Sequence, residues 1–545
     1  MAVTPTLPPD DATVKEYYAS GAWQAQTIYD IVVAHCAERP DAPAVTDSFR
    51  SYAWRELVGL VDAFAADLAR RGVERGDTIF VGAPNRIETI IALLAASRDG
   101  FVCCPSPHRN HTISEIADMC ARASCAVYIH QPGHGADADG DEILPLIRAI
   151  PSLRHVYELA ADSAGDPFGG FSGQPAAPAS GNPDLVTYLA FTSGSTGKPK
   201  GVMHSDNSQL VAARGIAGAW GFGSDTVTLS LSPFSHNLGC GTLWTSLVAG
   251  GAFVLHDWPR GESLLDRIAA AGVTYLVGVP THAMDLLAEL KARGIERYGQ
   301  LKSFRVSAAA CPEHVAADLF DCGIPVQKGY GMTETNGHQY SLPGDSRDLI
   351  IGTSGVCCPG YDLCIFDAND PDRALPAGEA GLVAGKGASL MLGYFEDRAA
   401  TLASMNNCGW FLTGDLGTLD ENGYLRLTGR KKELIVRGGH NINPNLLEDL
   451  ALRHDAIDLV AAIPVPDDRL GERACMAVMF EPGRSVTAAE MIAHLAAEGL
   501  SRYDMPEFWL PLADIPLMPN GKMEKLEIIR RVRDGAVTPE PITPA

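Results

Sequence analysis

The sequence predicts an α/β fold in which a large N-terminal domain with several sheets is followed by a small α+β domain. The chain has 545 residues, which is too long for a single hydrophobic core. Helical patterns alternate with apolar strands early in the chain, as in proteins with parallel sheets. A second, shorter alternation runs from Leu446 to Phe480, and a helical stretch follows at Ala488–Glu498. This is enough for a separate small domain.

Periodicity places the first elements in order along the chain. Residues 1–24 are expected to form a poorly ordered N-terminal arm. Residues 161–184 are rich in Ala, Gly, Pro and Ser and are expected to form a surface connection. Apolar residues at helical spacing predict helices at Ile28–Cys36, Trp54–Arg71, Arg86–Ser97 and Ile113–Ala121. Short apolar runs predict strands at Thr78–Gly82 and Cys125–Ile129.

Composition restricts the partners that the protein can bind. The 66 acidic residues against 43 basic ones give a formal net charge of −23, and no long Lys/Arg run offsets it. Such a chain repels nucleic acid and anionic membranes, so neither is expected as a partner. The long uncharged stretch Leu238–Leu255 contains four glycines and predicts a buried helix, a Gly-Gly turn and a strand, not a membrane span.

The cysteines and the N-terminus indicate a reducing compartment. The thirteen cysteines include no C-x-x-C pair, and the adjacent pairs Cys103–Cys104 and Cys357–Cys358 are poorly arranged for chelating a metal. Residues Met1–Lys15 carry Pro and Asp where a secretory signal would carry an apolar run. We therefore expect reduced, mostly buried thiols and a cytoplasmic location.

A loop rich in glycine and hydroxyl groups follows the apolar, strand-like run Leu185–Phe191. Glycines let the backbone aim several N–H groups at one anion, while hydroxyls add donors and a lysine adds a compact positive charge. The spacing differs from the Walker pattern, because Lys198 is followed by Pro199 and not by a magnesium-binding hydroxyl. A flexible Ser/Gly linker is the alternative, but linkers rarely follow a buried strand directly. The expected polyphosphate-binding residues are Thr192, Ser193, Gly194, Ser195, Thr196, Gly197 and Lys198.

A second motif, centred on Tyr330, combines two glycines with aromatic, hydroxyl and acidic side chains. Gly329 and Gly331 let the backbone approach a ligand closely, while the ring of Tyr330 offers a face for stacking on a base. Glu334 is an oxygen ligand suited to a magnesium ion that bridges phosphates. Thr333 can bond a phosphate oxygen or a substrate carboxylate. The alternative interpretation is a tight turn with a solvated glutamate.

Three further residues stand out by their local sequence. His236 lies in Pro-Phe-Ser-His-Asn, Asp415 ends the run Gly-Trp-Phe-Leu-Thr-Gly-Asp, and Lys522 lies in Pro-Asn-Gly-Lys-Met-Glu-Lys. A carboxylate after a glycine turn only accepts hydrogen bonds, as two ribose hydroxyls require. Taken alone, these residues have ordinary interpretations: a structural histidine, a solvated turn aspartate and a surface lysine.

In this order, the motifs resemble those of the adenylate-forming superfamily, which includes acyl- and aryl-CoA synthetases, peptide-synthetase adenylation domains and firefly-type luciferases. The resemblance covers roughly residues 25–530 and is greatest to a stand-alone acyl-CoA ligase. It implies an ATP- and acyl-binding domain at residues 25–430, a mobile lid domain at 431–535 and a tail at 536–545, after the N-terminal arm. The tail is expected to be disordered from Pro539.

The resemblance also implies a role for each candidate residue. His236 would position the carboxylate, and Lys522 would bridge that carboxylate and the α-phosphate. Lys432 would be the pivot of the lid, and Gly438 and Gly439 would line the path of the pantetheine arm. The implied catalytic residues are His236, Thr333, Glu334 and Lys522, with Glu334 also the metal ligand. The implied ligand-binding residues beyond the phosphate loop and the Tyr330 motif are Ala309, Ala310, Asp415, Arg430, Lys432, Gly438 and Gly439.

The implied activity is that of an ATP-dependent carboxylic acid–CoA ligase with ATP, Mg²⁺ and coenzyme A. The small acid substrate is expected to be aromatic, alicyclic or medium-chain, since no charged side chain points to a second acidic group. Two alternatives stay open: an enzyme that loads the acyl group onto a separate carrier protein, and a non-catalytic nucleotide-binding regulator. The presence of Glu334 and Lys522 argues against the regulator. The sequence leaves open whether the chain forms a homodimer.

Overall fold

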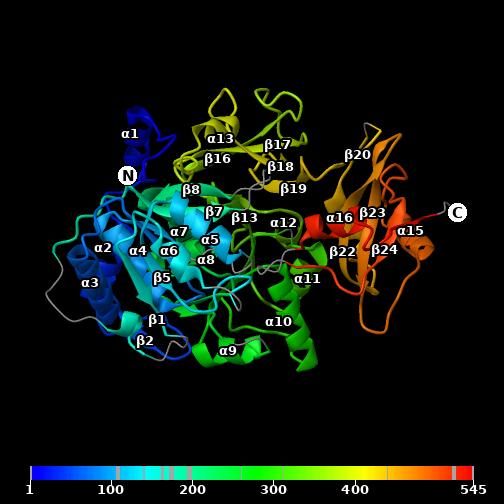
Figure 1. Cartoon of the computed structure of the whole chain (residues 1–545). Helices are drawn as coiled ribbons and strands as arrows, with labels where there is room; N and C mark the ends of the chain where they lie inside the picture. Colours follow the sequence, from blue (N-terminus) through cyan, green and yellow to red (C-terminus); the bar gives the residue numbers. More distant parts are fainter. Residues whose placement is uncertain are drawn as a thin grey trace.

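The computed structural model describes residues 3–105, 111–138, 142–160, 165–170, 177–192, 199–258, 261–309, 311–438, 440–517 and 523–542. Figure 1 shows the N-terminal part of the chain, from blue to green, as a body of stacked sheets and helices. A smaller yellow unit lies along one side of this body, and the C-terminal part, in orange and red, lies at its end. The arrangement is the predicted α/β fold with a separate small C-terminal unit.

The largest sheet, sheet A, runs through the N-terminal body. Its strands are β1 (Pro43–Thr46), β2 (Ser51–Ala53), β9 (Val227–Ser230), β10 (Ala252–Leu255), β11 (Tyr275–Gly278), β12 (Ser303–Val306), β13 (Val326–Met332), β14 (Asn336–Tyr340) and β15 (Val356–Cys357). Their order is β15-β14-β13-β12-β11-β9-β10-β1-β2. The strands from β13 to β1 are parallel, and antiparallel strands complete both edges. The parallel pairs are those that the alternation of helices and strands predicted.

A second sheet, sheet B, stacks on the same helices from the other side. Its strands are β3 (Thr78–Gly82), β4 (Val102–Cys104), β5 (Cys125–His130), β6 (His155–Glu158), β7 (Val186–Thr192) and β8 (Lys200–Ser205). Their order is β6-β5-β3-β4-β7-β8. All neighbours are parallel except β7 and β8, which form an antiparallel pair at the edge.

Helices fill the space between sheets A and B and cover their outer faces (Figure 1). The inner helices are α2 (Ile28–Glu38), α3 (Trp54–Arg70), α4 (Ile87–Asp99), α7 (Asp206–Ala219) and α8 (Asn237–Ala249). They share one apolar core with both sheets. The outer helices are α5 (Ile113–Arg122) and α6 (Ile143–Arg148) on sheet B, with α9 (Leu264–Ala271), α10 (Pro280–Ala292), α11 (Glu313–Asp321) and α12 (Arg347–Gly352) on sheet A. Helix α4 is apolar on nearly all sides, because it is buried on nearly all sides.

Two smaller sheets complete the chain. Sheet C is antiparallel and consists of β16 (Tyr361–Phe366), β17 (Gly381–Gly387), β18 (Phe411–Leu419) and β19 (Leu425–Arg430). The short helix α13 (Arg398–Ala403) lies between β17 and β18 in the chain. The C-terminal sheet consists of β20 (Ile435–Arg437), β21 (His440–Ile442), β22 (Ile457–Asp467), β23 (Gly471–Phe480), β24 (Phe508–Pro511) and β25 (Glu540–Pro541). It packs with α14 (Pro444–Ala451), α15 (Ala488–Ala497) and α16 (Lys525–Arg533). We call this unit the lid domain.

Most of the predicted elements are confirmed, and the two chain ends require correction. The stretch Leu238–Leu255 forms most of α8, a turn at Gly250 with φ of 69°, and β10. The N-terminal arm is not poorly ordered: Asp11–Ala19 is helix α1, and Trp23 is 4% exposed and donates to the carbonyl of Ala388 at 2.9 Å. In the expected tail, β25 pairs with β24. The domain boundary after residue 430 stays a prediction, although β19 ends there.

Within the described part of the chain, no helix combines the length and the apolar composition that a membrane span requires.

Candidate active site

A cleft of about 2580 Å³ is bordered by sheet A, sheet C and the lid domain. Many of the predicted site residues, taken from motifs far apart in the sequence, line it. These are Thr192, His236, Ala309, Gly329, Tyr330, Gly331, Thr333, Glu334, Asp415, Arg430 and Lys432. Gly438 is described but does not line the cleft. The remaining predicted positions lie outside the described residues: Ser193, Gly194, Ser195, Thr196, Gly197, Lys198, Ala310, Gly439 and Lys522.

The hairpin of β7 and β8 frames the predicted phosphate loop. Thr192, at the end of β7, pairs with Lys200, at the start of β8, and its Oγ1 donates to the Lys200 carbonyl at 3.4 Å. The ammonium of Lys200 lies 4.6 Å from the centre of the Tyr394 ring, a cation–π contact. Sequence analysis did not single out Lys200 or Tyr394, because they meet only through the tertiary pairing of their two segments, which includes the bridge between Val202 and Tyr394.

The carboxylate of Glu334 lines the cleft next to Tyr394. The Tyr394 hydroxyl donates to Glu334 Oε1 at 2.8 Å, and the backbone N–H of Met391 donates to the Glu334 carbonyl at 2.8 Å. Burial raises the pKa of Glu334, while the Tyr394 hydrogen bond and the charges of Lys200 and Arg430 lower it. A further cation bound at this carboxylate would favour its ionised form.

A buried hydrogen-bond network fixes the turn that carries Thr333 and Glu334. His204 Nε2 donates to the Thr333 carbonyl at 2.7 Å, and burial lowers the pKa of His204 to about 4. Its ring is therefore neutral near pH 7. Asn336 has φ of 58°, a conformation that asparagine tolerates better than most residues, and its Nδ2 donates to the Ser389 carbonyl at 2.9 Å. The turn is thus held in one conformation before any ligand binds.

Asp415 is the acceptor for two other predicted site residues. The Tyr330 hydroxyl donates to Asp415 Oδ2 at 2.6 Å, and Arg430 Nε lies 2.8 Å from Oδ1. Burial raises the pKa of Asp415, and the charge of Arg430 and the Tyr330 hydroxyl lower it. Because each carboxylate oxygen can accept more than one hydrogen bond, Asp415 can still accept from two hydroxyls of a ligand. The Tyr330 hydroxyl therefore positions Asp415, a role that the sequence pattern did not predict.

Asp415→Asn is expected to raise the KM for ATP by about 10–100-fold, because two charge-assisted hydrogen bonds, each worth about 1.5–3 kcal/mol, are replaced by neutral ones roughly half as strong. Tyr330→Phe is the matched control: it removes a donor to the same carboxylate but keeps the negative charge, so a smaller change is expected. The measurement is initial rate against ATP concentration at saturating acid. An unchanged KM for ATP in Asp415→Asn would contradict the ribose-binding assignment.

His236 immediately precedes α8, and its neighbours on both sides are fixed. Phe234 is 2% exposed, and its N–H donates to Asn85 Oδ1 at 3.0 Å. Asn237 Nδ2 donates to Asn336 Oδ1 at 3.2 Å. The start of α8 is therefore tied to the turn that follows Glu334, which explains how two motifs about a hundred residues apart reach one cleft.

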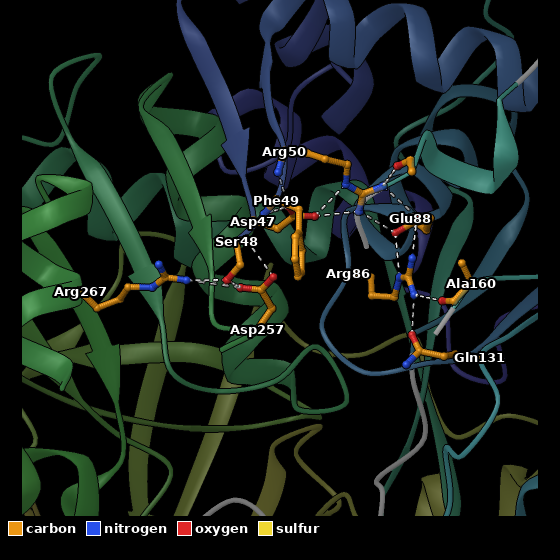
Figure 2. Close-up of polar contacts among 11 residues, drawn as sticks. Asp47, Ser48, Phe49, Arg50, Arg86, Glu88, Gln131, Ala160, Asp257 and Arg267 are labelled. Carbon is orange, nitrogen blue, oxygen red and sulfur yellow. Dashed lines mark hydrogen bonds and ion pairs between the residues drawn. The ribbon is translucent and has the colours of Figure 1, made fainter. Parts of the chain in front are cut away.

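A compact charged cluster lies beside the cleft (Figure 2), and Arg86 and Gln131 of this cluster line the cleft. The side chain of Glu88 is 1% exposed, with Arg50 Nη1 at 3.1 Å from Oε1 and Arg86 Nε at 3.1 Å from Oε2. Asp47 Oδ2 lies 2.7 Å from Arg50 Nη2. Arg86 also donates to Gln131 Oε1 at 2.7 Å. Arg50 and Arg86 of this cluster therefore each contact a carboxylate, as buried charges require.

The connection from sheet C to the lid domain is anchored on both sides of Lys432. The N–H of Lys431 donates to the Gly414 carbonyl at 2.9 Å. Asn443, which caps α14, donates to the Thr428 carbonyl. Lys432 itself is exposed on the cleft between these anchors. This position agrees with a pivot, and the role stays a prediction.

Gly438 has a structural reason to be glycine. Its φ is 57°, its N–H donates to the Leu470 carbonyl at 2.7 Å, and an added Cβ would lie 3.1 Å from Leu470 Cδ2. Further along the lid domain, Leu517 and Met523 form an antiparallel bridge and both line the cleft. Lys525 Nζ then lies 2.7 Å from Glu448 Oε1 and fixes the start of α16.

Comparison with known proteins supports the same assignment. The family model described as "AMP-binding enzyme" matches residues 32–395, and "AMP-binding enzyme C-terminal domain" matches residues 446–522. A salicylyl-CoA synthase / salicylate adenylyltransferase of Streptomyces sp is 30% identical over 535 residues, covering 95% of each chain. The medium-chain fatty-acid–CoA ligase of Escherichia coli (strain K12) is 27% identical over 533 residues, covering 95% of this chain and 93% of the relative.

Solved structures share the fold. ATP-bound MatB from Rhodopseudomonas palustris superposes with a TM-score of 0.83 at 24% identity, covering 94% of this chain and 99% of that one. The apo structure of Mycobacterium smegmatis MbtA gives a TM-score of 0.70 at 27% identity, covering 97% and 99%. The predicted fold and the predicted resemblance are both confirmed. The chain belongs to the AMP-binding enzyme family.

Proposed function

We propose that this protein is an ATP-dependent carboxylic acid–CoA ligase. It joins an acid to AMP with release of pyrophosphate, and then transfers the acyl group to coenzyme A with release of AMP. The observation that carries the proposal is the convergence of His236, Glu334 and Asp415 on one cleft beside the lid domain. Family membership and relatives named as CoA ligases for fatty and aromatic acids support it.

In the first half-reaction, a negatively charged carboxylate must approach the negatively charged phosphates of ATP. The substrate carboxylate attacks the α-phosphorus, a new O–P bond forms, and the bond to the β-phosphate oxygen breaks. Catalysis of such a step depends mainly on positioned donors and cations. In the proposal the loop from Thr192 to Lys198 holds the leaving phosphates, Lys522 bridges the carboxylate and the α-phosphate, and His236 positions the carboxylate.

The residues around Glu334 fit a magnesium ion. Magnesium is usually held by one or two carboxylates together with phosphates and water, not by a full set of protein ligands. Glu334 offers a hard oxygen ligand on the cleft, and the Tyr394 hydroxyl orients it. When bound there, magnesium would neutralise phosphate charge.

The second half-reaction requires the lid domain to move. In the proposal the lid turns about Lys432, withdraws Lys522 and brings the Gly438–Gly439 segment to the pantetheine arm. The contact that this motion would break or exchange is visible in the structure: Arg453 of the lid lies 3.4 Å from Glu313 of α11. Such an exposed ion pair contributes little stability and is suited to reversible opening.

A carrier protein as the acyl acceptor is the second candidate. The salicyl-AMP ligase / salicyl-S-ArCP synthetase of Mycobacterium tuberculosis (strain ATCC 25618 / H37Rv) is 29% identical over 553 residues, covering 96% of this chain and 94% of the relative. The family therefore includes enzymes whose names indicate each acceptor.

The thirteen free cysteines support a reducing location such as the cytoplasm.

Separate assays of the two half-reactions test the proposal. The purified chain is incubated with ATP, magnesium and a panel of aliphatic, alicyclic and aromatic acids, and pyrophosphate release is measured. Coenzyme A is then added and thioester formation is followed by mass spectrometry. We expect acid-dependent pyrophosphate release and a CoA thioester. Stalled acyl-AMP with CoA, relieved by a carrier protein, would favour the second candidate, and no pyrophosphate with any acid would contradict both.

A further inference from the structure

A single arginine, Arg305 of β12, lines the inner part of the cleft between sheet A and helices α7 and α8. It is 2% exposed. In the register of the sheet it lies opposite Val277 and Gln327, on the face that packs towards α7 and α8. Sequence analysis did not identify it, because an arginine inside a short apolar strand carries no motif.

The guanidinium of Arg305 has weak, neutral partners. Its Nη1 donates to Gln327 Oε1 at 3.4 Å and its Nη2 to the Gly337 carbonyl at 3.2 Å. The titratable groups that face it are the hydroxyls of Tyr275 and Tyr340, the thiol of Cys358 and the imidazole of His338. Within the described ranges no carboxylate forms an ion pair with it. Burial without a carboxylate lowers the pKa of Arg305.

The charged cluster in Figure 2 shows how the cleft-lining Arg86 and its neighbour Arg50 are paired. There Arg50 and Arg86 share the buried Glu88, and Arg50 also contacts Asp47. A buried guanidinium is costly unless it is paired with an anion or fully hydrogen-bonded. Arg305 offers five N–H donors, and the two long bonds above use only part of that capacity.

Two glycines make room for the guanidinium of Arg305 beside the cleft. A Cβ on Gly329 would lie 2.7 Å from Arg305 Cζ, and one on Gly337 would lie 2.8 Å from Nη2. Helix α7 adds a second donor to the same cleft, because Gln209 is 2% exposed, lines the cleft, and has no partner for its Nε2 while its Oε1 accepts from Trp244. The inner cleft therefore presents donors to whatever group enters it.

We propose that the acyl pocket recognises an acid whose far end carries an oxygen acceptor, best of all a second ionised carboxylate, which binds the guanidinium of Arg305. This inference rests on the proposed ligase function and narrows its substrate class. The planar guanidinium matches a carboxylate in two parallel hydrogen bonds, and a ketone oxygen would use one of them. It replaces the expectation, drawn from the sequence, that no charged side chain points to a second acidic group.

The test compares acids of matched size and several lengths that end in a carboxylate, a methyl ketone or an isopropyl group. The wild-type enzyme is expected to show a kcat/KM for pyrophosphate release that is about 10²-fold or more higher for the acceptor-bearing acids than for the isopropyl acids, because a site with buried donors rejects an analogue that leaves them unpaired. A larger preference for the carboxylate than for the ketone would identify the anion as the ligand. A preference for the isopropyl acids would overturn the inference.

Variants then connect the preference to Arg305. Arg305→Met is expected to reduce kcat/KM for the acceptor-bearing acids to the level of the isopropyl acids, without reducing the latter. Arg305→Lys should keep part of the preference for the carboxylate, since it keeps the charge but not the planar donors. Arg214→Met of α7 is the matched control, because Arg214 also has buried, unpartnered Nη atoms but does not line the cleft. It should leave the preference unchanged.

The outcomes separate this inference from the proposed function. An equal loss for all three acid types in Arg305→Met would mean that Arg305 only supports the fold, and the unfolding midpoint of each variant would show it. If that variant does not fold, the wild-type preference together with Arg305→Lys decides. No pyrophosphate from any acid would contradict the ligase function itself, whereas turnover without preference for an acceptor overturns only the Arg305 site.

Discussion

Lys522→Ala is expected to slow acyl-adenylate formation by about 10²–10³-fold, the effect of removing one donor that acts in the transition state. The sequence motif at Pro519–Lys525 and the resemblance to acyl-CoA ligases motivate the prediction, and the described residues Leu517 and Met523 on either side of Lys522 line the cleft. Conversion of supplied acyl-AMP and CoA to the thioester should largely survive, because the lid is expected to have withdrawn Lys522 by then. Pyrophosphate release and thioester formation are measured separately.

Lys525→Ala is the control that separates lost charge from a disturbed lid. Lys525 Nζ lies 2.7 Å from Glu448 Oε1, and Glu448, which is 7% exposed, also accepts from the Ala462 N–H at 2.7 Å. Removing Lys525 leaves a buried carboxylate without its cation, which is destabilising. We expect both half-reactions to fall together in Lys525→Ala, with a lower unfolding temperature. The same joint loss in Lys522→Ala would contradict an adenylation-specific role.

The fold was largely predictable because its signals are local. The strand Thr78–Gly82 coincides with β3, and the run before the phosphate loop coincides with most of β7. Apolar periodicity records which face of an element is buried, so it survives in the sequence alone. The N-terminal arm was predicted wrongly because its polar composition hides one anchor: Trp23 is buried against Tyr17 and Tyr18.

The site was predictable only where its residues belong to contiguous motifs. Glu334 and Asp415 follow glycine turns that mark them in the sequence. Tyr394 and His204 carry no such mark, because each acts on a residue far away in the chain. Arg305, which we propose binds the acid, lies inside a short apolar strand and becomes visible only when the strands are paired. Sequence patterns therefore located the groups that are expected to touch the nucleotide, but not those that orient them or select the acid.

Glu334→Gln is expected to lower the adenylation rate by at least about 10–100-fold at limiting magnesium, and to raise the magnesium concentration needed for half-maximal rate. The substitution keeps the size of the side chain and its acceptor for the Tyr394 hydroxyl, but removes the negative charge that would hold the ion. Tyr394→Phe is the matched control, since it removes the hydroxyl and keeps the charge. Its magnesium requirement should change less.

The pH dependence of the rate gives a second, independent test of the role of the Glu334 carboxylate. Burial raises the pKa of Glu334, with Tyr394, Lys200 and Arg430 opposing. A group with a raised pKa loses its charge as the pH falls through that value, so the wild-type rate at limiting magnesium should fall on the acidic side. Saturating magnesium favours the ionised form and should move this fall to lower pH. Glu334→Gln has no ionisable group at this position, so its rate at limiting magnesium should no longer show this decrease at acidic pH. An unaltered magnesium requirement together with an unaltered acidic fall would contradict the assignment of Glu334 as the metal ligand.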